Sequence, residues 1–213
     1  MNLYDYFRSS ASYRVRIALN LKKLSYQQIP VNLLKSEQRG AFHKQRNPQA
    51  AVPVLDLEGD FIPQSLAICE YLEESYPERY RLLPDDLLAR ARVRGLSQLI
   101  ACDIHPLNNL RVLRYLKATL EISEEEKLQW YRHWIYEGFE ALEAMLAESE
   151  LSSDFCHGDQ PGLADLCLVP QVYNAQRFEV DLSPYPMIQR IHAACQTIPA
   201  FMEAAPEKQR DLF

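Results

Sequence analysis

The chain has 213 residues, of which 47% are hydrophobic and 24% are charged. This is an ordinary globular composition, and the length supports a sizeable core without disulfides or structural metals. The formal net charge is −6 and no long lysine- or arginine-rich run exists, which argues against nucleic-acid binding because phosphates require clustered positive charge. The five cysteines form no CxxC pair and match no zinc spacing, so no metal site is predicted.

The N-terminal residues do not have the pattern of a targeting segment. The chain is polar within its first two residues and lacks the apolar region of a signal peptide. No apolar run approaches the roughly 20 residues that a membrane-spanning helix needs. An odd number of scattered cysteines suits a reducing compartment. We therefore expect a cytoplasmic protein.

The first part of the chain alternates strand and helix signals. Residues 2–7 are rich in aromatic side chains, which is typical of a short strand. The apolar spacing then changes to a helical one over residues 12–23, and the preceding serines supply a helix cap. Residues 26–31 favour a second strand, and residues 36–47 a short helix with loops.

A hairpin and a third helix complete this part. Residues 54–57 predict a strand, a turn follows, and residues 61–62 begin the return strand. Ser65 opens a helix that runs to about Tyr76 and is closed by Pro77. The order of strands and helices predicts a compact α/β domain over residues 1–82.

Strand signals vanish after the charged connector at residues 79–86. Long helical patterns follow at residues 87–118, 123–149, 163–177 and 184–204. The second domain, residues 87–213, is therefore expected to be all-helical.

Two short segments would present unpaired backbone groups. Val52-Pro53 precedes a strand, and a cis bond there would expose the backbone of Val52, although most such bonds are trans. Ser65 opens a helix, where free N–H groups and the helix dipole favour an anion. A plain N-cap role also explains Ser65 by itself.

A third segment suits a thiol. Ser9, Ser10 and Ser12 lie where the first strand passes into the first helix. A thiol at a helix start loses its proton more easily, and a serine hydroxyl that donates to the thiolate adds to this effect. The same serines also fit a simple helix cap.

In combination these segments resemble the cytosolic glutathione transferases. The stretch Ser9-Ser10-Ala11-Ser12-Tyr13-Arg14-Val15-Arg16-Ile17-Ala18-Leu19 is similar to the zeta-class signature Ser-Ser-Cys-x-Trp-Arg-Val-Arg-Ile-Ala-Leu of the maleylacetoacetate isomerase family. Further similar segments are Asn47-Pro48, Val52-Pro53, Gln64-Ser65-Leu66-Ala67-Ile68, Glu70-Tyr71-Leu72-Glu73-Glu74, Arg81-Leu82-Leu83-Pro84, His105-Pro106-Leu107-Asn108-Asn109-Leu110, Ala164 to Gln171, and Arg177-Phe178. The resemblance covers almost the whole chain.

The resemblance implies a fold and a glutathione site. Residues 1–82 would form a thioredoxin-like, glutathione-binding domain with a cis peptide at Val52-Pro53, and residues 87–213 a helical substrate-binding domain. The implied glutathione contacts are the backbone of Val52 for the cysteinyl part, Gln64 and Ser65 for the γ-glutamyl end, Gln38 for the glycine carboxylate, Ser9 or Ser10 for the thiolate, and Asn109. A homodimer is also implied.

The resemblance further implies a dicarboxylic substrate. Carboxylates favour arginine partners, and the candidates are Arg8, Arg111 and Arg177, of which Arg8 and Arg177 hold the better family positions. Asn108 and His105 are further substrate candidates. His105 either orients the substrate and moves a proton or has only a structural role before Pro106.

The implied activity is glutathione-dependent cis–trans isomerisation of maleylacetoacetate to fumarylacetoacetate in tyrosine and phenylalanine degradation. The expected cycle is thiolate addition to the conjugated carbon, rotation and elimination, with positive charge near the enolate oxygen. The family's cysteine is replaced by Ala11 here, which excludes a protein thiol at that place while glutathione still brings its own sulfur.

Three alternatives stay open. The first is a maleylpyruvate isomerase, because His105, Asn108, Asn109 and Arg111 also resemble residues of such bacterial enzymes. The second is glutathione conjugation or dehalogenation of small α-halo acids. The third is a non-catalytic glutathione-binding interaction protein, although such proteins typically lose the serine or the Gln-Ser pair that this chain keeps.

Overall fold

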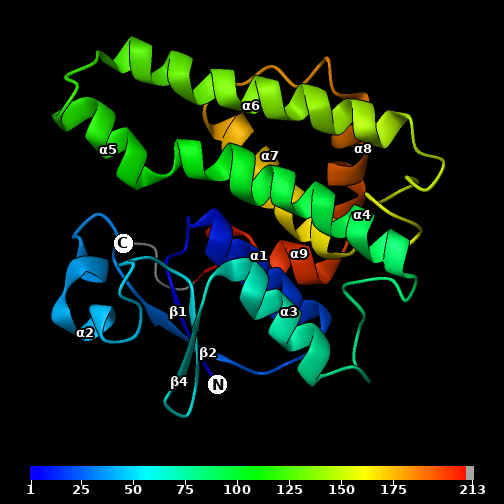
Figure 1. Ribbon diagram of the computed structural model, residues 1–213, viewed down its shortest axis with the longest axis horizontal. Helices are drawn as coiled ribbons and strands as arrows, with labels where there is room; N and C mark the ends of the chain where they lie inside the picture. Colours follow the sequence, from blue (N-terminus) through cyan, green and yellow to red (C-terminus); the bar gives the residue numbers. More distant parts are fainter. Residues whose placement is uncertain (210–213) are drawn as a thin grey trace. The chain divides into compact units, whose positions relative to one another are not determined.

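The computed structural model describes residues 1–209, which form two compact units. The first unit contains Met1–Leu83 and the described part of the segment that begins at Gln196, and the second contains Pro84–Cys195. Figure 1 labels their helices and strands along the chain.

The first unit is built on a four-stranded sheet in the order β2-β1-β3-β4. Its strands are β1 (Asn2–Asp5), β2 (Gln27–Pro30), β3 (Val54–Leu57) and β4 (Asp60–Pro63). Strand β1 pairs in parallel with β2 and antiparallel with β3, and β3 pairs antiparallel with β4. All four strands were predicted from the sequence.

The other elements of this unit are helical. They are α1 (Ser10–Leu21), η1 (Glu37–Arg39), α2 (Ala41–Lys44), α3 (Ser65–Ser75), α9 (Pro199–Ala204) and η4 (Pro206–Lys208). Helix α1 packs against both α3 and α9 (Figure 1). The mixed sheet and these helices form the thioredoxin-like domain that the resemblance implied.

Alternation along β1 separates the two faces of the sheet. Leu3 and Asp5 point to one face, where the Asp5 carboxylate meets Arg16 of α1. Tyr4 points to the other face, where its ring lies against His43 of α2. The buried Asp5 carboxylate therefore has a cationic partner that helix α1 supplies.

The second unit is built from helices, as expected. They are α4 (Leu87–Gln98), the π-helical η2 (Leu99–Ile104), the 3-10 turn η3 (His105–Asn108), α5 (Leu110–Ala118), α6 (Glu124–Ala147), α7 (Leu163–Arg177) and α8 (Pro186–Cys195). Over residues 1–209, the helices are too short or too polar to span a bilayer.

Two long predicted helices are interrupted. The pattern over 87–118 predicted one helix, but the α-helical bonding ends at Gln98 and resumes only at α5. Pro106 lacks an N–H for the helical ladder. The pattern over 184–204 likewise divides into α8 and α9 before Pro199, whose ring disfavours a helical conformation in the preceding residue.

The contacts place the C-terminal segment differently from the predicted domain of residues 87–213. From Gln196 the described chain groups with the first unit, because α1 donates three hydrogen bonds to its carbonyls. These run from Tyr13 Oη to Phe201 O at 3.3 Å, from Arg16 Nε to Ala204 O at 3.0 Å, and from Asn20 Nδ2 to Ala200 O at 3.1 Å. Nothing in the helical pattern of this segment distinguishes it from the helices before it.

Candidate active site

The register of the sheet brings the segments of interest in the first unit to one end of the sheet. Tyr4 pairs with Val54, and Val54 pairs with Pro63 on its other side. Asp5 pairs with Pro30 at the end of β2. The ends of β1, β2 and β4 and the beginning of β3 therefore lie together. The serine-rich turn, η1, the Val52-Pro53 bond and the start of α3 all adjoin this end of the sheet.

Ser9 caps helix α1. Its backbone is extended, and its Oγ accepts a hydrogen bond from Ser12 N at 3.2 Å. This bond uses an oxygen lone pair, so the hydroxyl proton can still be donated to a sulfur anion. Ser10 is the first residue of the helix and is 5% exposed. The geometry therefore favours Ser9 over Ser10 as the donor, a choice that the sequence left open.

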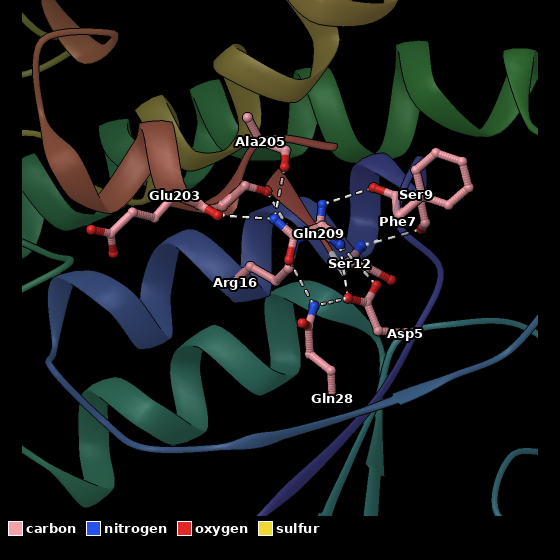
Figure 2. Close-up of polar contacts among 10 residues, drawn as sticks. Asp5, Phe7, Ser9, Ser12, Arg16, Gln28, Glu203, Ala205 and Gln209 are labelled. Atoms are coloured by element: carbon pink, nitrogen blue, oxygen red, sulfur yellow. Dashed lines mark hydrogen bonds and ion pairs between the residues drawn. The ribbon is translucent and has the colours of Figure 1, made fainter. Parts of the chain in front are cut away.

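A buried ion pair lies beneath the turn that carries Ser9. Arg16 is fully buried, and its Nη1 donates to the two carboxylate oxygens of Asp5 at 2.9 and 2.8 Å. Its Nη2 donates to Phe7 O at 2.9 Å, as Figure 2 shows. Gln28 Nε2 adds a bond to Asp5 Oδ2 at 2.9 Å. Because Phe7 lies two residues before Ser9, this network fixes the turn.

The C-terminal segment completes the network (Figure 2). Gln209 accepts from Gln28 Nε2 at 2.8 Å, and its own Nε2 donates to Glu203 O at 2.9 Å and Ala205 O at 2.7 Å. Neither Arg16 nor Gln209 was predicted to support the site. Two arginines two residues apart on one helix could have indicated that Arg16 faces the core. No feature of the sequence indicated a role for Gln209.

Arg8 projects from the same turn. Its Nη2 donates to Tyr6 Oη at 3.0 Å, and its Cζ lies 4.9 Å from the centroid of the Phe7 ring. The side chain is half-buried and always charged. A guanidinium held in this way suits the predicted role of binding a carboxylate.

The peptide bond between Val52 and Pro53 is cis, as the resemblance implied. The carbonyl of the preceding Ala51 is held twice, by His43 Nε2 at 2.9 Å and by Asn47 Nδ2 at 2.9 Å. Both donors are buried. They fix the approach to Val52, whose backbone is predicted to bind the ligand. The sequence analysis did not assign this role to His43 or Asn47.

Gln64 and Ser65 open helix α3. Gln64 has a φ of 73° and is the N-cap residue, and its Nε2 donates to Gln49 Oε1 at 2.6 Å. Ser65 is 6% exposed and accepts a hydrogen bond from Arg14 Nη1 at 3.2 Å. The first N–H groups of a helix have no partner within it and attract anions. This helix start can hold a carboxylate.

Gln38 lies on η1 and is 7% exposed. Its Oε1 has no hydrogen-bond partner among the described residues. The predicted contact of Gln38 with a glycine carboxylate stays a prediction.

In the second unit, Arg177 and Asn108 both interact with Tyr131. Arg177 ends α7, and its Cζ lies 5.2 Å from the centroid of the Phe178 ring, which stacks on Tyr131 at 3.8 Å. Asn108 Nδ2 donates to Tyr131 O at 2.9 Å. Burial raises the pKa of Tyr131, and the charge of Arg177 opposes that rise only in part. The phenol therefore stays neutral beside the guanidinium.

The remaining predicted residues of this unit lie along η3 and α5. His105 is the half-buried first residue of η3. Asn109 caps α5 by accepting a hydrogen bond from Arg111 N at 3.1 Å, and the side chain of Arg111 is exposed. Their predicted contacts with substrate or glutathione stay predictions.

Comparison with known proteins gives a consistent assignment. The family described as glutathione S-transferase, N-terminal domain, matches residues 3–80. The chain is 50% identical over 212 residues to a probable maleylacetoacetate isomerase of Vibrio cholerae, covering 98% of this chain and 97% of that protein.

Two solved structures have the same fold over nearly their whole length. The holo structure of a bacterial zeta-class maleyl pyruvate isomerase has a TM-score of 0.96 at 47% identity, covering 99% of each chain. A maleylacetoacetate isomerase from Anaeromyxobacter dehalogenans with GSH bound in its active site has a TM-score of 0.88 at 43% identity, covering 99% of this chain and 96% of that one. The chain described here therefore belongs to the zeta-class glutathione transferases of the maleylacetoacetate isomerase family.

Proposed function

We propose that this protein is a glutathione-dependent isomerase that converts maleylacetoacetate to fumarylacetoacetate in the degradation of tyrosine and phenylalanine. One observation carries the proposal. The Ser9 turn, the cis Val52-Pro53 bond and the Gln64-Ser65 helix start adjoin one end of the sheet, in a chain 50% identical to a protein named as such an isomerase.

The residues present fit glutathione. Its γ-glutamyl carboxylate matches the start of α3, where the buried guanidinium of Arg14 has N–H groups without partners in residues 1–209. Its cysteinyl part matches the backbone of Val52, which the cis bond and the anchored Ala51 carbonyl hold in place. Gln38 is the proposed donor to the glycine carboxylate, and Asn109 a further contact.

Bound glutathione supplies a thiolate nucleophile for reversible addition to the conjugated double bond. The Ser9 hydroxyl donates a hydrogen bond to the sulfur and so favours the thiolate over the thiol at neutral pH. Arg8 and Arg177 are proposed to hold the substrate carboxylates and to stabilise negative charge that develops on the carbonyl oxygen. Asn108, Arg111 and His105 are assigned to substrate positioning.

Maleylpyruvate is the second candidate substrate, because a maleyl pyruvate isomerase has a TM-score of 0.96 with this chain. The two isomerisations use the same chemistry and differ in the length of the substrate. The decisive test follows the ultraviolet absorbance of each substrate separately, with the purified protein and with and without glutathione. A kcat/KM at least tenfold higher for one substrate assigns it, and no glutathione-dependent change with either refutes the proposal.

The other two alternatives are separated by the same preparation. Turnover of a small α-halo acid without isomerisation would favour a transferase or dehalogenase, and tight glutathione binding without any turnover would favour a non-catalytic role. A homodimer in the cytoplasm belongs to the proposal as well. Light scattering after size-exclusion chromatography tests the dimer, and fractionation of cells tests the compartment.

A further inference from the structure

Arg14 is a buried cation without a matching anion. The residue is 2% exposed, and its Nη1 donates to Ser65 Oγ at 3.2 Å. Its Nε and Nη2 are buried and have no hydrogen-bond partner in the part of the chain that the structure describes. Guanidinium does not lose its proton in proteins, so the charge remains.

The other buried cations of α1 show that this is unusual. Arg16, two residues later, donates from all three guanidinium nitrogens and pairs with Asp5. Lys22, at the end of the helix, pairs with Glu73 at 2.8 Å. Buried charges in proteins are normally compensated because desolvation is costly. Arg14 departs from this rule within a helix that otherwise follows it.

The position of Arg14 indicates which kind of group compensates its positive charge. Among residues 1–209, the Arg14 side chain hydrogen-bonds only to Ser65, the first residue of the 11-residue helix α3. A helix start attracts anions through its free N–H groups and its dipole. Ser65 Oγ accepts from Arg14, so its hydroxyl proton can be donated to a ligand. The helix start and the unpaired guanidinium are independent features that both call for an anion.

We propose that Arg14 is the positioning residue and permanent countercharge for the α-carboxylate of the γ-glutamyl group. The inference rests on the proposed use of glutathione. Arg14 orients the Ser65 hydroxyl toward the carboxylate and places a positive charge beneath it. The ligand carboxylate compensates the charge of Arg14, as the Asp5 carboxylate compensates that of Arg16.

This role has a consequence that a purely structural arginine does not share. Without ligand, the protein carries a buried charge that lacks an anion, so replacing Arg14 by methionine removes an unfavourable term. Ligand-free Arg14→Met is therefore expected to unfold at the same temperature as the unaltered protein or a higher one. Its affinity for glutathione is nevertheless expected to fall. If Arg14 had only a structural role, its replacement would lower both the unfolding temperature and the affinity for glutathione.

The test measures binding by calorimetry with three ligands. They are glutathione, an analogue in which 4-aminobutanoyl replaces γ-glutamyl and so lacks the α-carboxylate, and an analogue whose glycine carboxylate is an amide. Each is titrated into the unaltered protein, Arg14→Met, Arg14→Lys and Asn20→Ala. The last is the matched control, because Asn20 lies on the same helix and bonds Ala200 O away from Ser65.

Loss of the α-carboxylate is expected to weaken binding to the unaltered protein and to Asn20→Ala by about 10- to 150-fold, which is the range for hydrogen bonds to charged groups. In Arg14→Met, loss of the α-carboxylate should weaken binding less than about threefold. The weakening in Arg14→Lys should lie between those of Arg14→Met and the unaltered protein. The glycine amide should weaken binding equally in all four proteins.

If removal of the α-carboxylate weakened binding equally in Arg14→Met and in the unaltered protein, that result would overturn this inference and leave the proposed function intact. If the unaltered protein does not bind glutathione, the proposed function and this inference fail together. Should Arg14→Met not fold, the same comparison with Arg14→Lys decides, since lysine keeps the charge and loses the planar fork.

Discussion

Helix α1 buries one arginine toward α9 and the sheet and another toward the start of α3, and the two environments differ. On the first side, Arg16 meets Asp5 and two carbonyls. On the second side, the Arg14 guanidinium hydrogen-bonds, within the described residues, to the Ser65 hydroxyl alone. The first side is complete within the protein and stabilises the fold, whereas the second becomes complete when an anion binds. Similar burial therefore does not mean a similar role.

The largest expected effect is on stability, and it concerns the side of α1 that carries Arg16. Arg16→Met leaves the Asp5 carboxylate buried without its cation, which should lower the free energy of unfolding by about 3–5 kcal/mol. Urea denaturation followed by circular dichroism measures it. The double variant Asp5→Asn with Arg16→Met removes both charges and should recover a large part of the loss. If the single variant were as stable as the parent, the ion pair would not be a stabilising element.

The next effect concerns the turn that this ion pair supports. Ser9→Ala removes the proposed donor to the sulfur and should lower kcat/KM about 100-fold, as loss of one preorganised donor typically does. It should also raise the pKa of the bound thiol, measured from thiolate absorbance near 240 nm in ultraviolet titrations. Ser10→Ala should change kcat/KM less than tenfold, and Ser9→Thr should retain the thiolate. Equal losses in both alanine variants would contradict the preference for Ser9.

A smaller effect is expected for the side of α1 that carries Arg14, in the absence of ligand. Arg14→Met should change the free energy of unfolding by at most about 1 kcal/mol, in the stabilising direction, because it removes a desolvated charge that no carboxylate balances. Urea denaturation in the absence of glutathione measures the change, with Asn20→Ala as the control that loses an ordinary hydrogen bond. A loss as large as that of Arg16→Met would mean that the two sides of α1 do not differ.

The last effect is a change in pH dependence, and it concerns the buried cation Lys22, which directly follows the last residue of α1. Burial raises the pKa of its partner Glu73, but hydrogen bonds from Lys22 and from the backbone N–H groups of Leu82 and Leu83 outweigh burial and leave the pKa below its ordinary value of 4.5. A lowered folded-state pKa gives stability that is present above the unfolded pKa and lost as the pH falls through the folded one.

Glu73→Gln should therefore be less stable than the parent at neutral pH and lose less stability on acidification below about pH 4.5. Denaturation at pH 7, 4.5 and 3 measures the two slopes, with the exposed Glu125→Gln as a control. Parallel slopes for parent and variant would show that the Glu73 pair does not contribute to acid sensitivity.

Local signals predicted much of the fold and part of the site. The aromatic strand, the serine cap of α1, the hairpin and the start of α3 each depend on neighbouring residues, and all four lie where the sequence placed them. The cis bond at Val52-Pro53 came from the family resemblance and is confirmed. The helix predicted over residues 87–118 was wrong in its middle, because apolar periodicity continues across Pro106 although the hydrogen-bond ladder does not.

The sequence by itself determined that two arginines two residues apart on one helix face opposite sides, since 3.6 residues make a turn. Which of them would find an anion was decided only by the tertiary structure. The partners of Arg16 include Ala204, 188 positions away, in a segment that the helical pattern assigned to the other domain. Propensities and caps act between near neighbours, whereas the pairing of a buried charge depends on distant segments that fold against it.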